Sequence, residues 1–254
     1  MNFNDKVVLV TGASSGIGAS IAIKFAEEGA RLVIVGRNQD KLNAVASKCA
    51  KPLVIVADVT KDADCKRIVN ETIALYGQLD VLINNAGVAN TCSILTENTM
   101  EVFDHVMSTN LRSAVNITTL AAPHLVKTKG NIVNMSSIAG SRVISSRSFA
   151  YCTSKAALDH FTRAVALDLA ATGVRVNSVN PGPVKTDIVE NTGANESHQA
   201  VIWDMMKKAT LLDRISEPEE VADVVLYLAS DKAAAITGAS YFIDNGAFLK
   251  GPWF

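Results

Sequence analysis

Short apolar runs alternate with helical patterns along almost the whole 254-residue chain. The runs lie at 7–10, 31–35, 53–57, 81–84, 131–135, 175–180 and 240–243. Each run is continuous rather than interrupted by polar residues, which is typical of strands buried on both faces of a parallel sheet. Helical spacing occupies 16–29, 38–49, 62–76, 98–127, 150–172 and 217–229. This alternation predicts a single α/β domain over 1–254, with a Rossmann-type doubly wound parallel sheet of about seven strands flanked by helices.

A glycine-rich turn joins the first apolar run to the first helical segment, in the order Thr11-Gly-Ala-Ser-Ser-Gly16-Ile-Gly18. A strand before the glycines and a helix after them is the context that a dinucleotide site requires. Gly12 permits a tight turn, Gly16 lets backbone approach a pyrophosphate, and Gly18 lets the helix pack closely on the strand. A glycine-rich stretch by itself is often only a flexible loop. In this context it predicts a cofactor site that contains Gly12, Ser14, Ser15, Gly16, Ile17 and Gly18.

Tyr151 and Lys155 are four residues apart in a segment with helical spacing, so they share one face of the predicted helix. A phenol has a pKa of about 10 and exchanges protons poorly at neutral pH. A neighbouring ammonium lowers that pKa toward the useful range. The pair Ser136-Ser137 precedes them. The three side-chain types together indicate a site that handles a proton and a carbonyl group.

Composition excludes several classes of function. The formal net charge is −1, and no basic or polybasic patch indicates nucleic acid or a membrane surface. No apolar stretch is long enough to span a bilayer, and the first residues lack the apolar core of a secretory signal. The four cysteines lack metal-site spacing, so we expect free thiols, no metal site and a cytoplasmic location.

The motifs, taken in order, resemble the classical short-chain dehydrogenase/reductase family. The matching residues run from Thr11 to Gly246 and include the glycine-rich turn, Asp58, Asn84-Asn85-Ala86-Gly87, Asn110, Ser137, Tyr151-x-x-x-Lys155 and Pro181-Gly182. Within the family, the chain is similar to 3-oxoacyl-acyl-carrier-protein reductase-like carbonyl reductases. The resemblance implies reversible hydride transfer between a nicotinamide cofactor and an alcohol or carbonyl, without metal. Asn245 stands where many members have glycine, which affects the C-terminal turn or subunit packing rather than the chemistry.

The resemblance also assigns catalytic roles. Tyr151 is the general acid in reduction and the general base in oxidation, and Lys155 lowers its pKa and holds the nicotinamide ribose. Ser137 orients the carbonyl oxygen and is preferred to Ser136 for its spacing from the following glycine. Asn110 resembles the residue that steadies a helix kink and holds a water leading to Lys155. Singly, each residue also fits an ordinary role: core tyrosine, solvated lysine, turn serine or helix-interior asparagine.

The same resemblance places further residues around the cofactor. Asp58 resembles the adenine-contacting aspartate, although a helix or turn cap is its alternative, and Val59 follows it. Thr186 resembles the residue that bonds the carboxamide. The remaining implied contacts are Asn85, Ala86 and Gly87 on the adenosine side and Pro181, Gly182 and Val184 at the nicotinamide end.

The end of the second apolar run bears on cofactor choice. A site that prefers NAD usually has an acid there for the ribose 2′-hydroxyl, but this chain has Gly36, followed by Arg37 and Asn38. A guanidinium suits a 2′-phosphate in charge and geometry. We therefore expect NADP(H) to be preferred over NAD(H), the alternative being that Arg37 only faces solvent.

The substrate is expected to be a hydrophobic carbonyl or a 3-oxoacyl-type compound. Apolar residues around the site include Val143, Phe149, Trp203 and Met206, and the segment 186–212 is either a substrate lid or a surface helix–loop–helix. Arg142 or Arg147 is an alternative contact for an acidic substrate group. The resemblance further implies a homotetramer or homodimer built through the long helices.

Two other functions remain as alternatives. One is a non-catalytic nucleotide-sensing or scaffold protein on the same fold. Such a protein has no need for the complete set Asn110, Ser137, Tyr151 and Lys155. The other is an epimerase or dehydratase acting on nucleotide sugars. Members of that class usually carry an added C-terminal substrate domain, which the short chain after 243 argues against.

Overall fold

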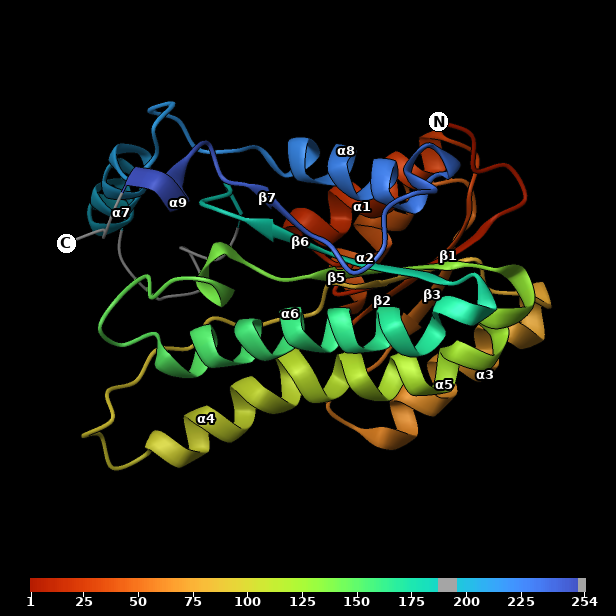
Figure 1. Ribbon diagram of the computed structural model, residues 1–254, viewed down its shortest axis with the longest axis horizontal. Coiled ribbons are helices and arrows are strands. Elements are labelled where there is room, and N and C mark those ends of the chain that lie inside the picture. The colour runs from red at the N-terminus through yellow and green to blue at the C-terminus, as the bar shows by residue number, and fades with distance from the viewer. Residues whose placement is uncertain (187–195, 251–254) are drawn as a thin grey trace.

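A computed structural model describes residues 1–186 and 196–250, and within them seven strands form one parallel sheet (Figure 1). The spatial order is β3-β2-β1-β4-β5-β6-β7, with the reversal between β1 and β4 that defines a doubly wound sheet. The strands are β1 (Val7–Thr11), β2 (Arg31–Gly36), β3 (Leu53–Val56), β4 (Val81–Asn84), β5 (Asn131–Met135), β6 (Arg175–Pro181) and β7 (Ser240–Ile243). The Rossmann-type parallel sheet predicted from the apolar runs is confirmed.

Helices connect the strands and cover the sheet. They are α1 (Gly16–Glu27), α2 (Gln39–Ala46), α3 (Asp62–Tyr76), α4 (Thr99–Met107), α5 (Ser113–Thr128), α6 (Phe149–Leu169), α7 (Glu196–Lys208), α8 (Pro218–Ala229) and α9 (Ala247–Lys250). A π-helical turn, η1 (Ser108–Arg112), joins α4 to α5, and short 3₁₀ turns lie at η2 (Ile138–Gly140), η3 (Ala170–Thr172) and η5 (Asp231–Ala233). The segment 98–127 is thus two helices around a π turn rather than one regular helix.

Two hydrophobic layers, one on each face of the sheet, hold the fold together. On β1, Val8 and Val10 pack in the layer with α1 and α8, whereas Val7 and Leu9 pack in the layer with α3 and α5. Successive side chains of a strand point to opposite faces, so a continuous apolar run supplies both layers. Figure 1 shows α1 and α8 on one side of the sheet and α4, α5 and α6 on the other.

The segments that carry the predicted site meet at the carboxyl ends of the strands. The glycine-rich turn follows β1, Asn85 follows β4, Ser136-Ser137 follow β5, and Gly182 follows β6. In an open parallel sheet these ends form one edge, and ligands bind there. Figure 1 shows α7 and α9 beyond the same edge, where β6 ends.

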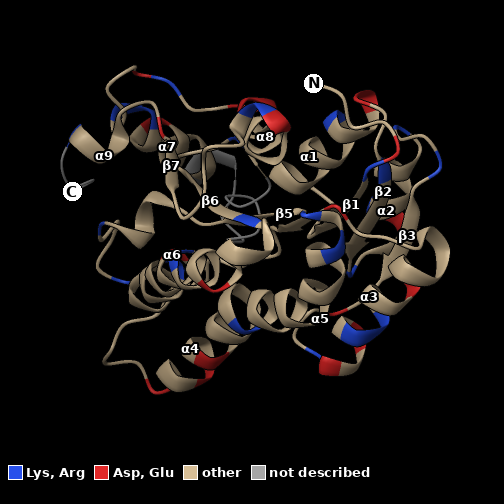
Figure 2. Ribbon diagram, turned by 45° about the vertical axis from the view of Figure 1, so that its right-hand side comes forward, with Lys and Arg blue, Asp and Glu red and all other residues tan. Residues whose placement is uncertain are grey.

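Charged residues of both signs are interspersed along the outer helices rather than collected by sign (Figure 2). Over the described residues, no helix is long and apolar enough to cross a membrane.

Candidate active site

The glycine-rich turn between β1 and α1 leaves no room for side chains at two of its glycines. Gly12 has a φ of +65°, and a Cβ built there lies 2.8 Å from the Ala86 Cα. A Cβ on Gly18 lies 2.2 Å from the Gly12 carbonyl oxygen. Gly16 has a φ of +54°, and its Cβ position is 3.1 Å from Thr186 Cγ2. The turn is therefore closely packed against the end of β4, and any larger residue at Gly12 or Gly18 must displace backbone or the Asn85 side chain.

Contacts from the end of β4 hold this turn in place. Thr11 Oγ1 accepts hydrogen bonds from the backbone N–H groups of Asn85 and Ala86, at 3.0 and 3.1 Å. The Asn85 side-chain amide donates to the carbonyl oxygens of Thr11 and Gly12, at 2.9 and 3.1 Å. The predicted adenosine-side segment thus supports the turn as well as flanking it.

The start of α1 fits a dinucleotide pyrophosphate. Ser15 stands at the N-cap without a side-chain capping hydrogen bond, and no acidic side chain occupies the first turn. The first N–H groups of a helix have no intrahelical acceptor, and the helix dipole is positive there. Both properties favour a phosphate ligand. Ser14, Ser15, Gly16 and Ile17 would hold it, as the sequence predicts.

The end of β2 combines a crowded glycine with an exposed arginine. A Cβ on Gly36 lies 3.2 Å from the Ser14 Cβ, so a longer side chain there must push against the glycine-rich turn. Arg37 is exposed, and its charge acts on Asp58 at the end of the neighbouring strand. Partial burial raises the pKa of Asp58, but hydrogen bonds from Thr60 and the charge of Arg37 outweigh burial and hold that pKa below its ordinary value. The rim of the site near Arg37 therefore carries both signs of charge.

Two other predicted cofactor residues also serve the fold. Asn38 caps α2, with its Oδ1 accepting from the Lys41 backbone N–H at 2.9 Å. The Val59 side chain is buried in the layer against α3, and its carbonyl oxygen accepts from Cys65 Sγ at 3.1 Å.

The segment after β6 lies close to the start of α1. Pro181 is the last residue of β6, and a Cβ on Gly182 lies 2.7 Å from the Asp244 Cβ, beyond the end of β7. Val184 forms a β-bridge with Ser216. Thr186 follows and faces Gly16. Four predicted nicotinamide-end residues thus lie on a short path from the sheet edge toward the phosphate-binding turn.

Asn110 lies in the π-helical turn η1 and is 1% exposed. Its Oδ1 accepts from the Val88 N–H at 2.8 Å, while its Nδ2 donates to the Val88 carbonyl at 2.9 Å and to Ser154 Oγ at 3.0 Å. A Cβ on Gly87 lies 3.4 Å from Asn110 Oδ1 and 3.5 Å from Lys155 Nζ. Asn110 and Lys155 therefore converge on Gly87. A π turn in the middle of a helix frequently marks a functional site.

The two neighbouring serines have different surroundings. Ser137 caps the 3₁₀ turn η2, where its Oγ accepts from the Ala139 N–H at 3.1 Å, and it is hydrogen-bonded to the Tyr151 phenol. Ser136 Oγ instead donates to the Lys155 carbonyl oxygen at 3.2 Å. The structure therefore brings Ser137, the preferred serine, together with Tyr151.

Tyr151 and Lys155 share one face of α6, and burial acts on the pKa of both groups. Burial raises the pKa of Tyr151, and the hydrogen bond from Ser137 opposes this rise. Burial lowers the pKa of Lys155 to about 8, and the charge of Asp159 opposes this change. Lys155 Nζ lies 5.7 Å from the Tyr151 ring centroid and donates to the Met135 carbonyl at 2.8 Å. Burial opposes the expected effect of Lys155 on the phenol, and the lowering of the Tyr151 pKa by Lys155 stays a prediction.

The loop after η2 is tied to the C-terminal segment. Arg142 Nη1 donates to the carbonyl oxygens of Ala247 at 2.6 Å and Phe248 at 3.2 Å. One nitrogen of the Arg142 guanidinium thus holds α9, and the alternative in which Arg142 binds an acidic substrate group stays a prediction. Arg147 is exposed.

The predicted lid is only partly within the described residues. Residues 187–195 lie outside them, whereas α7 supplies the half-buried Trp203 and Met206. Over the described residues, no group of three or more histidine, cysteine, aspartate or glutamate side chains could hold a metal ion.

Sequence reasoning missed three polar residues that organise the site. Thr11 binds the Asn85-Ala86 backbone, Ser154 binds Asn110, and Asn180 Nδ2 donates to the Ser137 carbonyl oxygen at 3.1 Å. Polar residues at the last position of buried strands, as at Thr11, or one residue before it, as at Asn180, are the signal that could have found two of them.

A glycine-rich turn at the reversal point of the sheet, with a serine–tyrosine–lysine cluster at the same edge, defines a dinucleotide-binding protein of the Rossmann class. The model of a family described as Enoyl-(Acyl carrier protein) reductase matches residues 12–247. The chain belongs to the short-chain dehydrogenase/reductase family of oxidoreductases.

Individual relatives match the chain over nearly its whole length. It is 37% identical over 249 residues to a meso-2,3-butanediol dehydrogenase of Serratia marcescens, covering 97% of this chain and 96% of the relative. It is 34% identical over 254 residues to a 3-oxoacyl-acyl-carrier-protein reductase of Thermotoga maritima, covering 98% and 100%. A solved short-chain dehydrogenase/reductase of unknown function from Caenorhabditis elegans, with cofactor, superimposes with a TM-score of 0.91 at 34% identity, covering 97% and 96%.

Proposed function

We propose that the protein is an NADP(H)-dependent reductase that transfers a hydride to a ketone and, in reverse, oxidises a secondary alcohol. The observation that carries this proposal is the cluster in which Ser137 is hydrogen-bonded to the half-buried Tyr151 while Lys155 lies over the same ring. The cluster sits at the sheet edge that carries the phosphate-binding turn. A nicotinamide cofactor, when bound, supplies the hydride.

The side chains of the site handle the oxygen of the substrate. In reduction, the Tyr151 hydroxyl donates its proton to the carbonyl oxygen as negative charge develops there. The raised pKa keeps this phenol protonated and ready to donate at neutral pH. Ser137 donates a second hydrogen bond that orients the carbonyl. Lys155 supplies a positive charge over the Tyr151 ring, and Asn110 braces the backbone at Val88.

A substrate panel tests the proposal. Oxidation of NADPH and NADH is followed by absorbance with hydrophobic ketones, diketones, quinones and 3-oxoacyl thioesters. Turnover with NADPH supports the reductase. Tight cofactor binding with no turnover across the panel would instead favour the nucleotide-sensing alternative, which has the same fold and phosphate-binding turn.

Apolar side chains near the site support a hydrophobic carbonyl or 3-oxoacyl-type substrate. Phe149, at the start of α6, stacks on Phe103 with ring centroids 6.4 Å apart. Val143 is exposed in the loop between η2 and α6. Trp203 and Met206 on α7 belong to the proposed lid over 186–212. The relatives named for butanediol and 3-oxoacyl substrates both act on a carbonyl–alcohol pair, which agrees with this class.

Changing Arg37 to aspartate is expected to shift the ratio of kcat/KM for NADPH over NADH toward NADH by about 10- to 100-fold. A charge-assisted hydrogen bond to the 2′-phosphate contributes about 1.5–3 kcal/mol, and an acid in its place repels that phosphate. The measurement is steady-state kinetics with both cofactors at one ionic strength. Lys48→Asp, which makes the same charge change at an exposed site after α2, is the matched control. An unchanged ratio in Arg37→Asp excludes Arg37 as the phosphate-reading residue.

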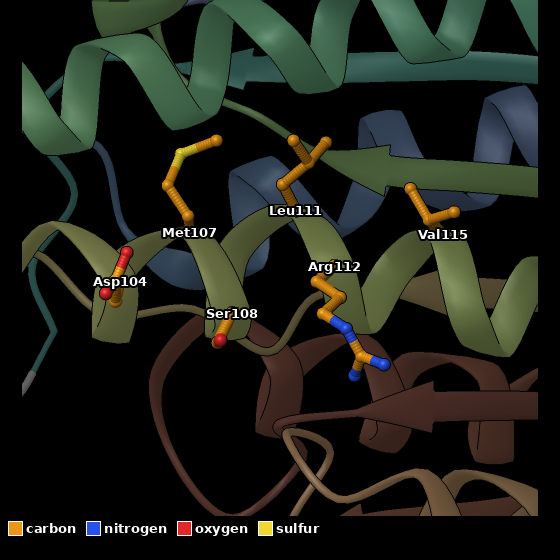
Figure 3. A pocket seen from close by; sticks show the side chains of 6 residues that line it. All are labelled: Asp104, Met107, Ser108, Leu111, Arg112 and Val115. Carbon is orange, nitrogen blue, oxygen red and sulfur yellow. The ribbon is translucent and has the colours of Figure 1, made fainter.

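We also propose that two copies of the chain associate through the α4–η1–α5 surface. Met107, Leu111 and Val115 recur every four residues there and line an open groove of about 510 Å³ (Figure 3). On the neighbouring helix α6, Leu167 is 81% exposed. An apolar stripe between exposed helices suits an interface between identical subunits, as in the homodimer or homotetramer that the family resemblance implies.

Leu111→Arg is expected to lower the molar mass in solution by about half or more, because an interface core loses stability when a charge is placed in it. Size-exclusion chromatography with light scattering measures the mass. Leu75→Arg, at an exposed leucine on α3 outside the groove, should leave the mass unchanged. A monomeric wild-type protein would contradict the association.

A cytoplasmic location also remains part of the proposal, supported by the four unpaired cysteines.

A further inference from the structure

Asp159 is a buried carboxylate that the proton-transfer scheme above does not use. It lies on α6 one turn after Lys155, and both residues are 4% exposed. A buried carboxylate is costly unless hydrogen bonds or a nearby cation stabilise it. Its position therefore requires an explanation.

Two side chains from β6 bind Asp159. Asn180 Nδ2 donates to Asp159 Oδ2 at 2.8 Å, and Ser178 Oγ lies 3.1 Å from Asp159 Oδ1 as a donor. The same Asn180 Nδ2 donates to the Ser137 carbonyl oxygen at 3.1 Å. One amide group thus links the carboxylate to the backbone of the residue that orients the substrate oxygen.

The 3₁₀ turn after Ser137 packs directly on this carboxylate. A Cβ on Gly140 lies 2.5 Å from Asp159 Oδ2 and 3.0 Å from the Lys155 carbonyl oxygen. Any larger residue at Gly140 would push the turn away from α6. Ser137, Lys155 and Asp159 are therefore held in one closely packed unit.

Among the residues that the structure describes, Asp159 is also the charged group that acts on Lys155. Burial lowers the pKa of Lys155 to about 8, and the charge of Asp159 opposes this change. The other elements packed around the lysine face it with uncharged groups. These are the Met135 carbonyl from β5, Asn110 from η1 and the Tyr151 ring from α6.

We propose that Asp159 is a positioning residue that keeps Lys155 charged and, through Asn180, fixes the backbone of Ser137. The inference rests on the proposed reductase function and adds to it a group that touches neither substrate nor cofactor. Tyr151 donates a proton most effectively when an ammonium lies beneath it, so a buried anion that retains this ammonium acts on the reaction through Lys155.

Asp159→Asn tests the charge while nearly preserving shape. The protein is labelled with ¹³C-lysine, and the Lys155 signal is assigned by its loss in Lys155→Met. The titration midpoint of Lys155 is expected to fall by about one pH unit, because a unit charge a helical turn away has been removed. Asp168→Asn, an equal charge change at an exposed site on the same helix, should leave the midpoint in place. An unmoved midpoint in Asp159→Asn overturns the proposal, whether or not the enzyme turns over.

The activity arm uses the pH profile of kcat/KM for carbonyl reduction. Lys155 loses its proton before Tyr151, whose pKa is raised, so the alkaline limb reports the lysine. That limb should move to lower pH by the same amount as the NMR midpoint. A lower rate with an unmoved limb would show a purely structural role and overturn the proposal. Absence of turnover in the wild type would refute the proposed function alone, since the NMR titration still decides the effect of Asp159.

A second, smaller substitution tests the same charge in case Asp159→Asn does not fold. Asp159→Ser removes the charge, keeps an acceptor for Asn180 and leaves room for a water, and it carries the same expected shift of the Lys155 midpoint. Ser178→Ala removes one hydrogen bond but keeps the charge, so its midpoint should stay close to that of the wild type. A shift in Ser178→Ala as large as in Asp159→Asn would attribute the effect to packing and overturn the charge-based proposal.

Discussion

Tyr151→Phe is expected to reduce kcat for carbonyl reduction by about a thousandfold or more, while the dissociation constant for NADPH stays within about twofold. A positioned general acid contributes about 10²- to 10⁴-fold to rate, and phenylalanine has no proton to give. Tyr151 is half-buried on α6 with Ser137 as its hydrogen-bond partner, so the substitution removes one hydroxyl and leaves the apolar contacts of the ring. Stopped-flow or steady-state rates and fluorescence titration of NADPH make the two measurements.

Tyr76→Phe is the matched control for this experiment. Tyr76 lies on α3, away from the sheet edge that carries the site, and its hydroxyl donates to the Leu32 carbonyl oxygen at 3.3 Å. Removing that hydroxyl should leave kcat unchanged. If Tyr151→Phe retains more than about a tenth of wild-type activity, the proton comes from another group and the assignment of Tyr151 is wrong.

Lys155→Met is expected to abolish turnover and at the same time stabilise the fold at neutral pH by about 1–2 kcal/mol. Lowering the pKa of a lysine from 10.5 to about 8 corresponds to about 3 kcal/mol of unfavourable energy for the buried ammonium. The loss of the hydrogen bond to the Met135 carbonyl and of the countercharge to Asp159 offsets part of this gain.

The stability that Lys155→Met gains over the wild type should decrease as the pH rises. Below about pH 8 the folded protein holds the lysine charged, so the wild type carries the full cost. Between about 8 and 10.5 the folded state releases its proton before the unfolded state does, and the wild type becomes relatively more stable. The free energy of unfolding in urea at pH 7 and pH 10 should therefore show a smaller difference between Lys155→Met and wild type at pH 10. Lys66→Met, at an exposed lysine on α3, should show no such trend, and a destabilised Lys155→Met at pH 7 would refute the expectation.

The sheet was largely predictable because each strand is a continuous apolar run. The segments at 81–84, 131–135 and 240–243 match β4, β5 and β7 residue for residue, and the other strands differ by one residue at an end. The long helical segment at 98–127 was less predictable. Its spacing is regular, but the side chain of Asn110 takes up the backbone groups of Val88 from another segment, and the helix widens into a π turn there.

The sequence by itself determined the parallel sheet and the family, because each depends on local order: apolar runs, glycines at set intervals, and Tyr151 four residues before Lys155. Only the tertiary structure decided the electrostatics of the site. Asp159 and Asn180 are distant in sequence from Ser137, and they reach it only when β6 packs against α6. Burial, which no local pattern reports, then sets the pKa of Tyr151 above and that of Lys155 below its ordinary value.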